Sequence, residues 1–134
     1  AAISIDLVAA SDTPDIHGGN AVEVGAGPVV GTYTFHGRGT LNGLIPHPRL
    51  LQIVEESAQA QKVDLQRHAT IGLLTDASYV QLVGEGVACV DVAWPTRYTH
   101  SGVEVCSLDD LEALTKLLIG VVKKFPTEEN FSRG

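Results

Sequence analysis

The segment Asp91-Val92-Ala93-Trp94-Pro95-Thr96-Arg97-Tyr98-Thr99-His100-Ser101-Gly102-Val103-Glu104 leads from an apolar run into a polar loop. The apolar run extends from Gly86 to Trp94, and Asp91 is its one charged residue. Such a run predicts a central strand of a sheet that is covered on both faces. His100 therefore stands where a buried strand passes into a loop. This is a usual place for functional groups, because the strand is rigid and the loop is accessible.

The segments around this strand predict an α/β fold. Alternating or short apolar runs indicate strands, and apolar residues three or four positions apart indicate helices. The predicted strands are 3–8, 29–35, 65–74 and 87–94, and the predicted helices are 48–62, 77–83 and 107–124. This order of elements predicts a mixed β-sheet flanked by helices, with the first strand in the interior of the sheet.

Each predicted helix begins with recognisable capping residues. Pro46-His47-Pro48 opens the first helix, with its second proline in the favoured first turn and the histidine at the helix start. Thr75 or Asp76 is the predicted cap of the short second helix. Ser107 is the predicted cap of the last helix, and Asp110, three positions on, would complete a capping box.

Composition limits the class of protein. The 134 residues suffice for one domain with a core, and 44% hydrophobic with 19% charged residues is typical of a globular protein. A net charge of -7 without a Lys/Arg cluster argues against a nucleic-acid partner. No apolar run approaches the roughly 20 residues of a membrane-spanning helix, and the N-terminus has no signal-peptide pattern. Cys89 and Cys106 do not have the spacing of a metal-binding pair, and no disulfide framework is visible. Two free thiols predict a cytoplasmic location for the protein.

Residue by residue, the chain offers few chemical groups in a known pattern. Its five histidines show neither a two-histidine helical spacing nor a His-Glu-x-x-His motif, and no nucleophile elbow or P-loop occurs. Asp6, in the first predicted strand, and His100 are ligand types that accept zinc, cobalt or manganese. A lone strand carboxylate is more often paired with a backbone group, and a lone histidine is more often packed. Two such residues do not define a metal site.

Six short motifs, each weak alone, are specific in their order and spacing. They are Ile5-Asp6-Leu7, Ser11-Asp12-Thr13-Pro14, Gly25-Ala26-Gly27-Pro28, Pro46-His47-Pro48, Thr75-Asp76-Ala77 and Arg97-Tyr98-Thr99-His100-Ser101. With Glu104 after the last motif, the series resembles the C-terminal part of the glutamyl aminopeptidase/tetrahedral aminopeptidase family. Members of that family are di-metal exopeptidases, and some carry an endoglucanase label. The resemblance covers nearly all of residues 1–134.

The resemblance implies a fold and a set of site residues. The fold would be the C-terminal portion of a zinc-exopeptidase-like catalytic domain, with the chain as one partial domain. Asp6 would be a carboxylate ligand of one divalent ion and His100 an imidazole ligand of the other, with zinc, cobalt or manganese as the metal. Asp76 would help to shape the site, and Arg97 and Tyr98 would support the loop that aims His100.

Departures from the family pattern limit the expected activity. In the family, an N-terminal portion supplies a His-x-Asp motif, a bridging aspartate and a glutamate pair that includes the general base, and none of these motifs occurs here. Glu55-Glu56 lies inside a predicted helix, and Leu73-Leu74 replaces a glycine pair. The family's small inserted β domain is absent as well. We therefore expect the chain to begin inside a catalytic domain, to bind metal poorly and not to hydrolyse peptides alone.

Two interpretations of function remain open. In the first, the chain is part of an aminopeptidase that removes N-terminal residues from peptides. It would then cover its exposed sheet by associating with a complementary N-terminal part or with itself. In the second, it is a non-catalytic binding or assembly module of the same fold, and we expect a homo-oligomer. A glycan-active hydrolase is disfavoured, because no carboxylate pair is placed to flank a sugar.

Overall fold

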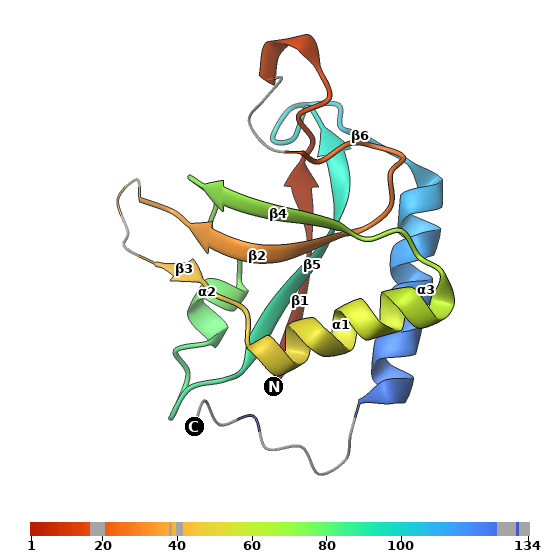
Figure 1. The fold of residues 1–134 in the computed structure, drawn as a ribbon. Coiled ribbons are helices and arrows are strands. Elements are labelled where there is room, and N and C mark those ends of the chain that lie inside the picture. The colour runs from red at the N-terminus through yellow and green to blue at the C-terminus, as the bar shows by residue number, and fades with distance from the viewer. Residues whose placement is uncertain (17–20, 38, 40–41, 126–130, 132–134) are drawn as a thin grey trace.

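The structure, a computed structural model, describes residues 1–16, 21–37, 39, 42–125 and 131. A mixed sheet lies at its centre (Figure 1). The helices α1 (Pro48–Gln61) and α3 (Leu108–Lys124) pack on one face, and the short helix α2 (Ala77–Val80) packs on the other. Within the described ranges, no helix is both long and apolar enough to cross a bilayer.

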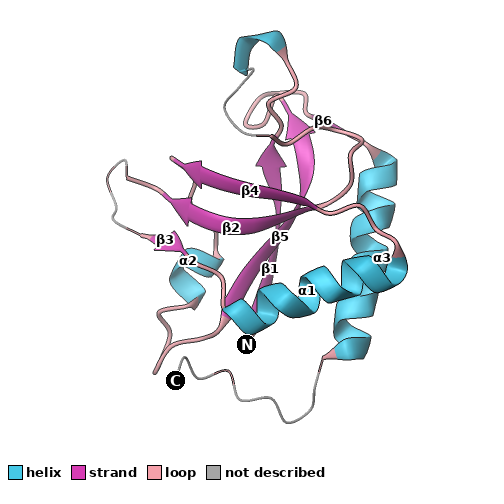
Figure 2. Cartoon of the chain, viewed as in Figure 1, coloured by secondary structure: helices cyan, strands magenta, loops and turns pink. Residues whose placement is uncertain are grey.

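The sheet is organised around its longest strand. The six strands of the described residues are β1 (Ala2–Ala9), β2 (Val29–Phe35), β3 (Gly43–Leu44), β4 (Gln66–Ile71), β5 (Cys89–Arg97) and β6 (Val105–Cys106). β5 runs parallel to β1 and antiparallel to both β2 and β6. β2 in turn pairs in parallel with β4 and antiparallel with β3. Figure 2 shows these strands flanked by the helices, so the predicted mixed β-sheet flanked by helices is confirmed.

The two faces of β5 belong to different apolar clusters. Val90 and Val92 point to α1 and α3, and both are fully buried among Ile53, Leu117 and their neighbours. The residues at alternate positions face the other way. Of these, Cys89 packs with α2, and Ala93 packs with Val8 of β1, Val29 of β2 and residues of the loop between them. The predicted cover on both faces of this strand is therefore confirmed. Burial of a valine side chain such as that of Val90 contributes about 1.5–3 kcal/mol.

Helix α1 begins as the sequence predicts. His47 is its N-cap, and the Arg49 amide donates to His47 Nδ1 at 3.2 Å. Pro48 is the first helical residue, where the missing N–H has no cost. The helix ends at Lys62, which has a left-handed φ of 55°. His47 thus has a local structural role as a cap.

Helix α3 begins differently from the prediction in one respect. The Asp110 amide donates to Ser107 Oγ at 3.4 Å, which confirms Ser107 as the cap. The Asp110 carboxylate does not complete a capping box. It is buried and accepts the amides of Gly25 at 2.7 Å and Gly27 at 2.8 Å, two residues of a distant turn. Both glycines have positive φ, which aims their amides at the helix start.

Within the described residues, the first strand is at an edge, whereas its composition predicts an interior position. β1 lies at the edge of the described sheet, because β5 is its only strand partner there. Ile5 is consequently 54% exposed, although the run around it has the composition of an interior strand. An apolar edge of this kind can pair with a strand of another chain.

Three predicted ends also differ from the structure by three residues each. β4 ends at Ile71 instead of Leu74. β5 ends at Arg97 instead of Trp94, because both β1 and β6 continue to pair with it. Helix α2 ends at Val80 instead of Val83, because the Leu82 and Val83 amides bond three residues back, to Tyr79 and Val80. Of the loop expected between the first two strands, residues 17–20 lie outside the described part of the chain.

Replacing Asp110 by asparagine is expected to lower the free energy of unfolding by about 2 kcal/mol. A buried carboxylate that accepts two amides becomes a neutral group with one acceptor oxygen. Asp109→Asn, at the exposed neighbouring position in the same helical turn, is the matched control and should cost about 0.5 kcal/mol. Urea unfolding followed by far-UV circular dichroism measures both. Equal costs for the two variants would contradict the role given to Asp110.

Candidate functional site

The Arg-Tyr-Thr-His-Ser motif forms the turn between β5 and β6. Arg97 is the last residue of β5 and pairs with Val105 of β6. Tyr98 and His100 have left-handed backbone angles, with φ of 60° and 62°, which are uncommon for residues with a side chain. The His100 amide donates to Glu104 Oε1 at 2.8 Å. Glu104 therefore holds the turn that presents the exposed His100 side chain.

Asp12 clamps the end of β5 through Arg97. Arg97 Nε donates to Asp12 Oδ1 at 2.8 Å and Arg97 Nη2 donates to Oδ2 at 2.7 Å, a bidentate pair. The Val24 amide also donates to Oδ2, at 2.9 Å. The hydrogen bonds from Arg97 lower the pKa of Asp12 from its ordinary 3.8 to about 2, and Asp12 raises the pKa of Arg97 in return. The loop after β1 is thus fixed to the strand that leads to His100.

A hollow of about 230 Å³ opens beside this clamp. It lies where the parallel strands β1 and β5 end, and its walls include Thr13, Ile16, Arg97 and Tyr98. The carboxyl ends of parallel strands are the usual ligand-binding edge of an α/β sheet. Arg97 and Tyr98 therefore line a hollow at that edge.

Asp6 lies on β1, opposite Ala93 of β5. Its side chain is half-buried, and the Leu7 amide donates to Asp6 Oδ1 at 2.7 Å. Pairing with a backbone group is what an ordinary strand carboxylate does. The geometry within this chain gives Asp6 a local partner, and a metal role for it stays a prediction.

A second carboxylate, Asp91, is more deeply buried than Asp6. It is 3% exposed, and Thr75 Oγ1 donates to Asp91 Oδ2 at 2.8 Å. Burial raises the pKa of Asp91, and the charges of Asp6 and Asp76 raise it further, while hydroxyls of Thr75 and Ser4 lower it. Asp6 and Asp76 therefore lie close enough to Asp91 to interact with it. The structure brings these three carboxylates to one region of β1, β5 and α2.

Asp76 occupies the N-cap position of α2 without acting as its cap. Its side chain makes no capping hydrogen bond and is exposed, so the predicted cap is wrong. Thr75, the other predicted cap, uses its hydroxyl for Asp91 instead. Asp76 borders a hollow of about 240 Å³ together with Ile3 and Ile5 of β1. It is therefore directed towards the first half of β1.

His100 is separated from the α2 end of this carboxylate region, where Asp76 lies. The β5–β6 turn that carries it and helix α2 lie at opposite ends of the sheet (Figure 1). Within the described residues, no three His, Cys, Asp or Glu side chains are grouped so that they could hold a metal ion. Asp6 and His100 are suitable donor types, but two donors from this chain do not fit a two-metal centre by themselves.

Sequence reasoning assigned no role to three buried or clamped residues. Asp12 could have been found from its place in a turn that follows a strand parallel to the one ending in Arg97. Asp91 was visible as the one carboxylate in an otherwise apolar run. His68 gave no signal. It is buried on β4, which lowers its pKa, and a side chain added at Gly31 would meet both His68 Nε2 at 3.3 Å and Asp91 Cβ at 3.4 Å.

The sequence and the fold match known proteins. The model of the M42 glutamyl aminopeptidase family matches residues 1–117. The chain belongs to this family. It is 38% identical over 131 residues to SgcX of Escherichia coli (strain K12), which is named as a candidate aminopeptidase. That match covers 95% of this chain and 35% of SgcX.

Solved structures give the same result. The TET aminopeptidase of a marine-sediment Thaumarchaeota archaeon matches with a TM-score of 0.86 and 28% identity, over 97% of this chain and 35% of that one. The Pyrococcus horikoshii TET1 peptidase, described as assembling into a tetrahedron or a large octahedral shell, matches with a TM-score of 0.63 and 25% identity. Its match covers 89% of this chain and 32% of that one. The M42 chain thus spans about a third of its relatives' length, and the expected family and the C-terminal portion of its fold are confirmed.

Replacing Asp12 by asparagine is expected to lower the free energy of unfolding at pH 7 by about 1–2 kcal/mol. The variant loses the bidentate ion pair, and solvent at the partly exposed Arg97 screens part of the loss. Asp15→Asn, at an exposed position three residues on, is the control and should change little. Because the pKa of Asp12 is depressed to about 2, its stabilisation is complete above pH 4 and is lost as the pH falls towards 2. Urea unfolding of wild type and variant should converge over that interval, and a constant difference would contradict the clamp.

Asp91→Asn is expected to raise the free energy of unfolding at pH 7. The pKa of Asp91 is raised in the fold, so its contribution is complete below the ordinary value of 3.8 and is lost as the pH rises through the folded-state pKa. Asparagine cannot ionise and keeps an oxygen to accept from Thr75. The gain should therefore be present at pH 7 and absent below pH 3.8 in paired thermal melts. A variant less stable than wild type at pH 7 would show that the ionised carboxylate is favoured in the fold.

Proposed function

We propose that this chain forms the C-terminal part of an M42 aminopeptidase catalytic domain and contributes two metal ligands to it. The observation that carries the proposal is the place of the His100 turn. It lies beyond the carboxyl ends of the parallel strands β1 and β5, and β1 carries Asp6. Family membership supports an exopeptidase that removes residues from the N-termini of peptides. On this proposal, Asp6 and His100 each bind one divalent ion, which would be zinc, cobalt or manganese.

The other site residues then act through position. The ion pair of Asp12 with Arg97 fixes the end of β5, and Glu104 holds the turn, so the imidazole of His100 is presented from a defined backbone. Tyr98 borders the hollow beside it, where part of a peptide would lie. Asp76 adds negative charge near Asp91 of β5, in the region where β1 carries Asp6.

The chain alone is not expected to catalyse hydrolysis. Each ion of a two-metal centre needs several donors, and a general base must activate the water. We propose that these groups come from a complementary N-terminal part, which would pair with the exposed edge of β1. Self-association is the other way to cover apolar surface, and the assembly described for the TET1 relative supports it. Two free thiols, Cys89 and Cys106, favour the cytoplasm as the location.

A non-catalytic assembly module is the second candidate function. It is favoured by the apolar edge of β1, where Ile5 is 54% exposed. Such an edge can add a strand from another protein without any chemistry. In that case Asp6 and His100 would be replaceable without loss of function.

Complementation tests the proposal. The chain is mixed with the N-terminal two thirds of SgcX, and native mass spectrometry verifies that the two parts assemble. The release of nitroaniline from aminoacyl nitroanilides is then measured in the presence of zinc, cobalt or manganese. The chain alone should match the buffer rate, and the assembled pair should be active. His100→Ala or Asp6→Asn should reduce that activity at least 100-fold, more than the 10–100-fold typical of outer partners. Asp109→Asn is the control.

Three results would overturn it. Hydrolysis by the chain alone would remove the need for a complementary part. An assembled pair that is inactive, or that stays active without Asp6 and His100, would favour the assembly module.

A further inference from the structure

A hollow of about 400 Å³ lies where the start of α1 meets the segment that joins α2 to β5. The His47 amide donates to the Cys89 carbonyl at 2.8 Å, which fixes these two segments to each other. Figure 1 shows them at the lower end of the sheet, whereas the His100 turn follows the upper end of β5. Because a strand rises about 3.3 Å per residue, the nine residues of β5 separate the two places by roughly 26 Å.

A buried hydrogen-bond donor at this hollow has no acceptor. His47 lines the hollow and is 5% exposed. Its Nδ1 accepts the Arg49 amide, so the neutral ring carries its proton on Nε2. His47 Nε2 is buried and has no hydrogen-bond partner among the described residues. A buried donor without an acceptor is unfavourable, so a ligand that supplies an acceptor would be favoured here.

The rest of the lining supplies acceptors and apolar surface. Gln81 Nε2 already donates to two backbone carbonyls, which leaves Gln81 Oε1 available to accept. Glu85 is exposed and takes part in none of the ion pairs between described residues. The apolar walls of the hollow are Val87, Ala88 and Phe131.

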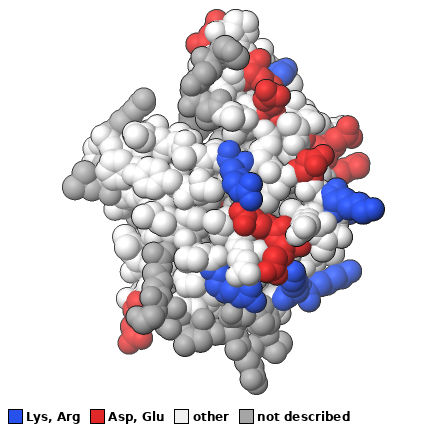
Figure 3. Space-filling view, viewed as in Figure 1, with Lys and Arg blue, Asp and Glu red and all other residues white. Residues whose placement is uncertain are grey.

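The charge of the hollow favours a cation. Among the described residues that line it, Glu85 is the charged one, and none is a lysine or an arginine. Figure 3 shows an acidic group at the lower left, over the segment between α2 and β5, with no basic side chain beside it. Glu85 would repel a carboxylate ligand and attract an ammonium group. A neutral carbonyl is therefore the better acceptor for His47 Nε2.

We propose that this hollow binds a small primary ammonium compound that also carries a neutral amide carbonyl, as an amino-acid amide does. The carbonyl oxygen accepts from His47 Nε2, and the ring of Phe131, which packs against the imidazole, moves aside to admit it. Glu85 and Gln81 Oε1 hold the ammonium group. The volume is that of a small-molecule site, since such pockets span about 300–1,000 Å³. The site needs neither a metal ion nor a complementary N-terminal part, so it goes beyond the proposed aminopeptidase role.

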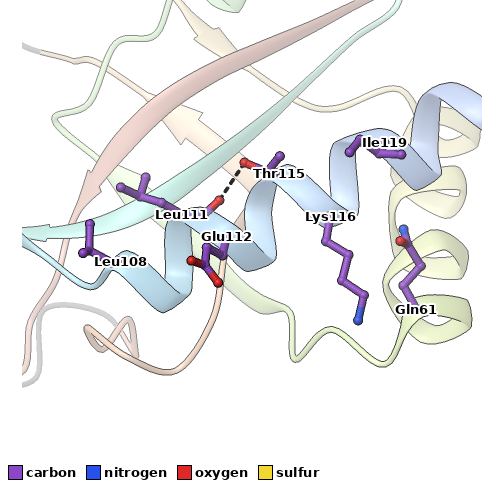
Figure 4. Close-up of a pocket in the computed structure, with 7 residues that line it drawn as sticks. All are labelled: Gln61, Leu108, Leu111, Glu112, Thr115, Lys116 and Ile119. Carbon is purple, nitrogen blue, oxygen red and sulfur yellow. Dashed lines mark hydrogen bonds between the residues drawn. The ribbon is translucent and has the colours of Figure 1, made fainter.

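The larger groove along α3 lacks this combination. It measures about 460 Å³, and Figure 4 shows Glu112 and Lys116 extending from the same helix. Their opposite charges leave the groove without a preference for a charged ligand. The Thr115 hydroxyl donates to the Leu111 carbonyl at 2.9 Å, so it is already used. Gln61 Nε2 has no partner, but its side chain is only partly buried.

An NMR titration of the 15N-labelled chain with L-leucinamide tests the proposal. The probe is small and makes few contacts, so the expected Kd is about 0.1–1 mM. At pH 7 its α-amino group is largely charged. EDTA is present, so no metal ion contributes. The amide signals of residues 85–88 should shift and saturate, and the Nε2–H signal of His47 should move because it gains an acceptor.

Two variants separate the two polar contacts. Glu85→Gln should weaken both leucinamide and 3-methylbutylamine, an amine without a carbonyl, about fivefold. His47→Asn keeps a cap for α1, because asparagine is a favoured N-cap, but its shorter side chain cannot reach the ligand. It should weaken leucinamide about fivefold and leave 3-methylbutylamine unchanged. Glu112→Gln, at an exposed carboxylate of α3, is the control and should change neither.

N-acetyl-leucinamide, which has no ammonium group, should bind about tenfold more weakly than leucinamide. Equal binding of these two probes would overturn the proposal. So would the absence of shifts up to about 10 mM leucinamide, shifts confined to the hollow beside Tyr98, or normal binding by Glu85→Gln. If His47→Asn does not fold, the acetylated probe and Glu85→Gln decide the matter. No arm measures hydrolysis, so failure of the aminopeptidase proposal would leave this result unaffected.

Discussion

The parallel pairing of β1 with β5 is the contact on which the other features of this molecule depend. It runs in register from Ala2 opposite Cys89 to Ala9 opposite Thr96, so it joins the start of the chain to the strand that carries the family motif. Parallel strands end at the same edge, and that edge holds the hollow and the His100 turn. Loss of this pairing would separate Asp6 from the rest of the candidate site.

The fold could be predicted where burial leaves a local pattern in the sequence. β5 is apolar on both faces because helices and loops cover both, and a continuous apolar run is what such cover requires. The edge position of β1 could not be predicted, because its residues have the composition of an interior strand. Among the described strands, β5 alone pairs with it. Asp110 shows the same limit at a helix start. The capping-box pattern is local, whereas the preferred partners of its carboxylate are two amides more than 80 residues away.

The candidate site could be predicted from motif order but not from single residues. His100 and Arg97 stand out because they follow a buried strand. Asp12 acquires its role only when the turn after β1 meets the end of β5, a contact that no local spacing reveals. Asp91 becomes unusual only in the fold, where burial and two neighbouring carboxylates act on it together. Sequence patterns report the periodicity of elements, while the electrostatics of a site depends on which elements become neighbours.

The two carboxylate clamps also have a consequence for how the chain acquires its structure. Asp110 reaches the Gly25 amide and Arg97 reaches Asp12, and both contacts span 85 positions in the sequence. Contacts of such long range form late, because a large loop must close before they contribute. During synthesis, the turn near Gly25 therefore has no carboxylate to hold it until the start of α3 has left the ribosome. Two turns that the ribosome releases early are thus fixed only after much of the chain has followed them.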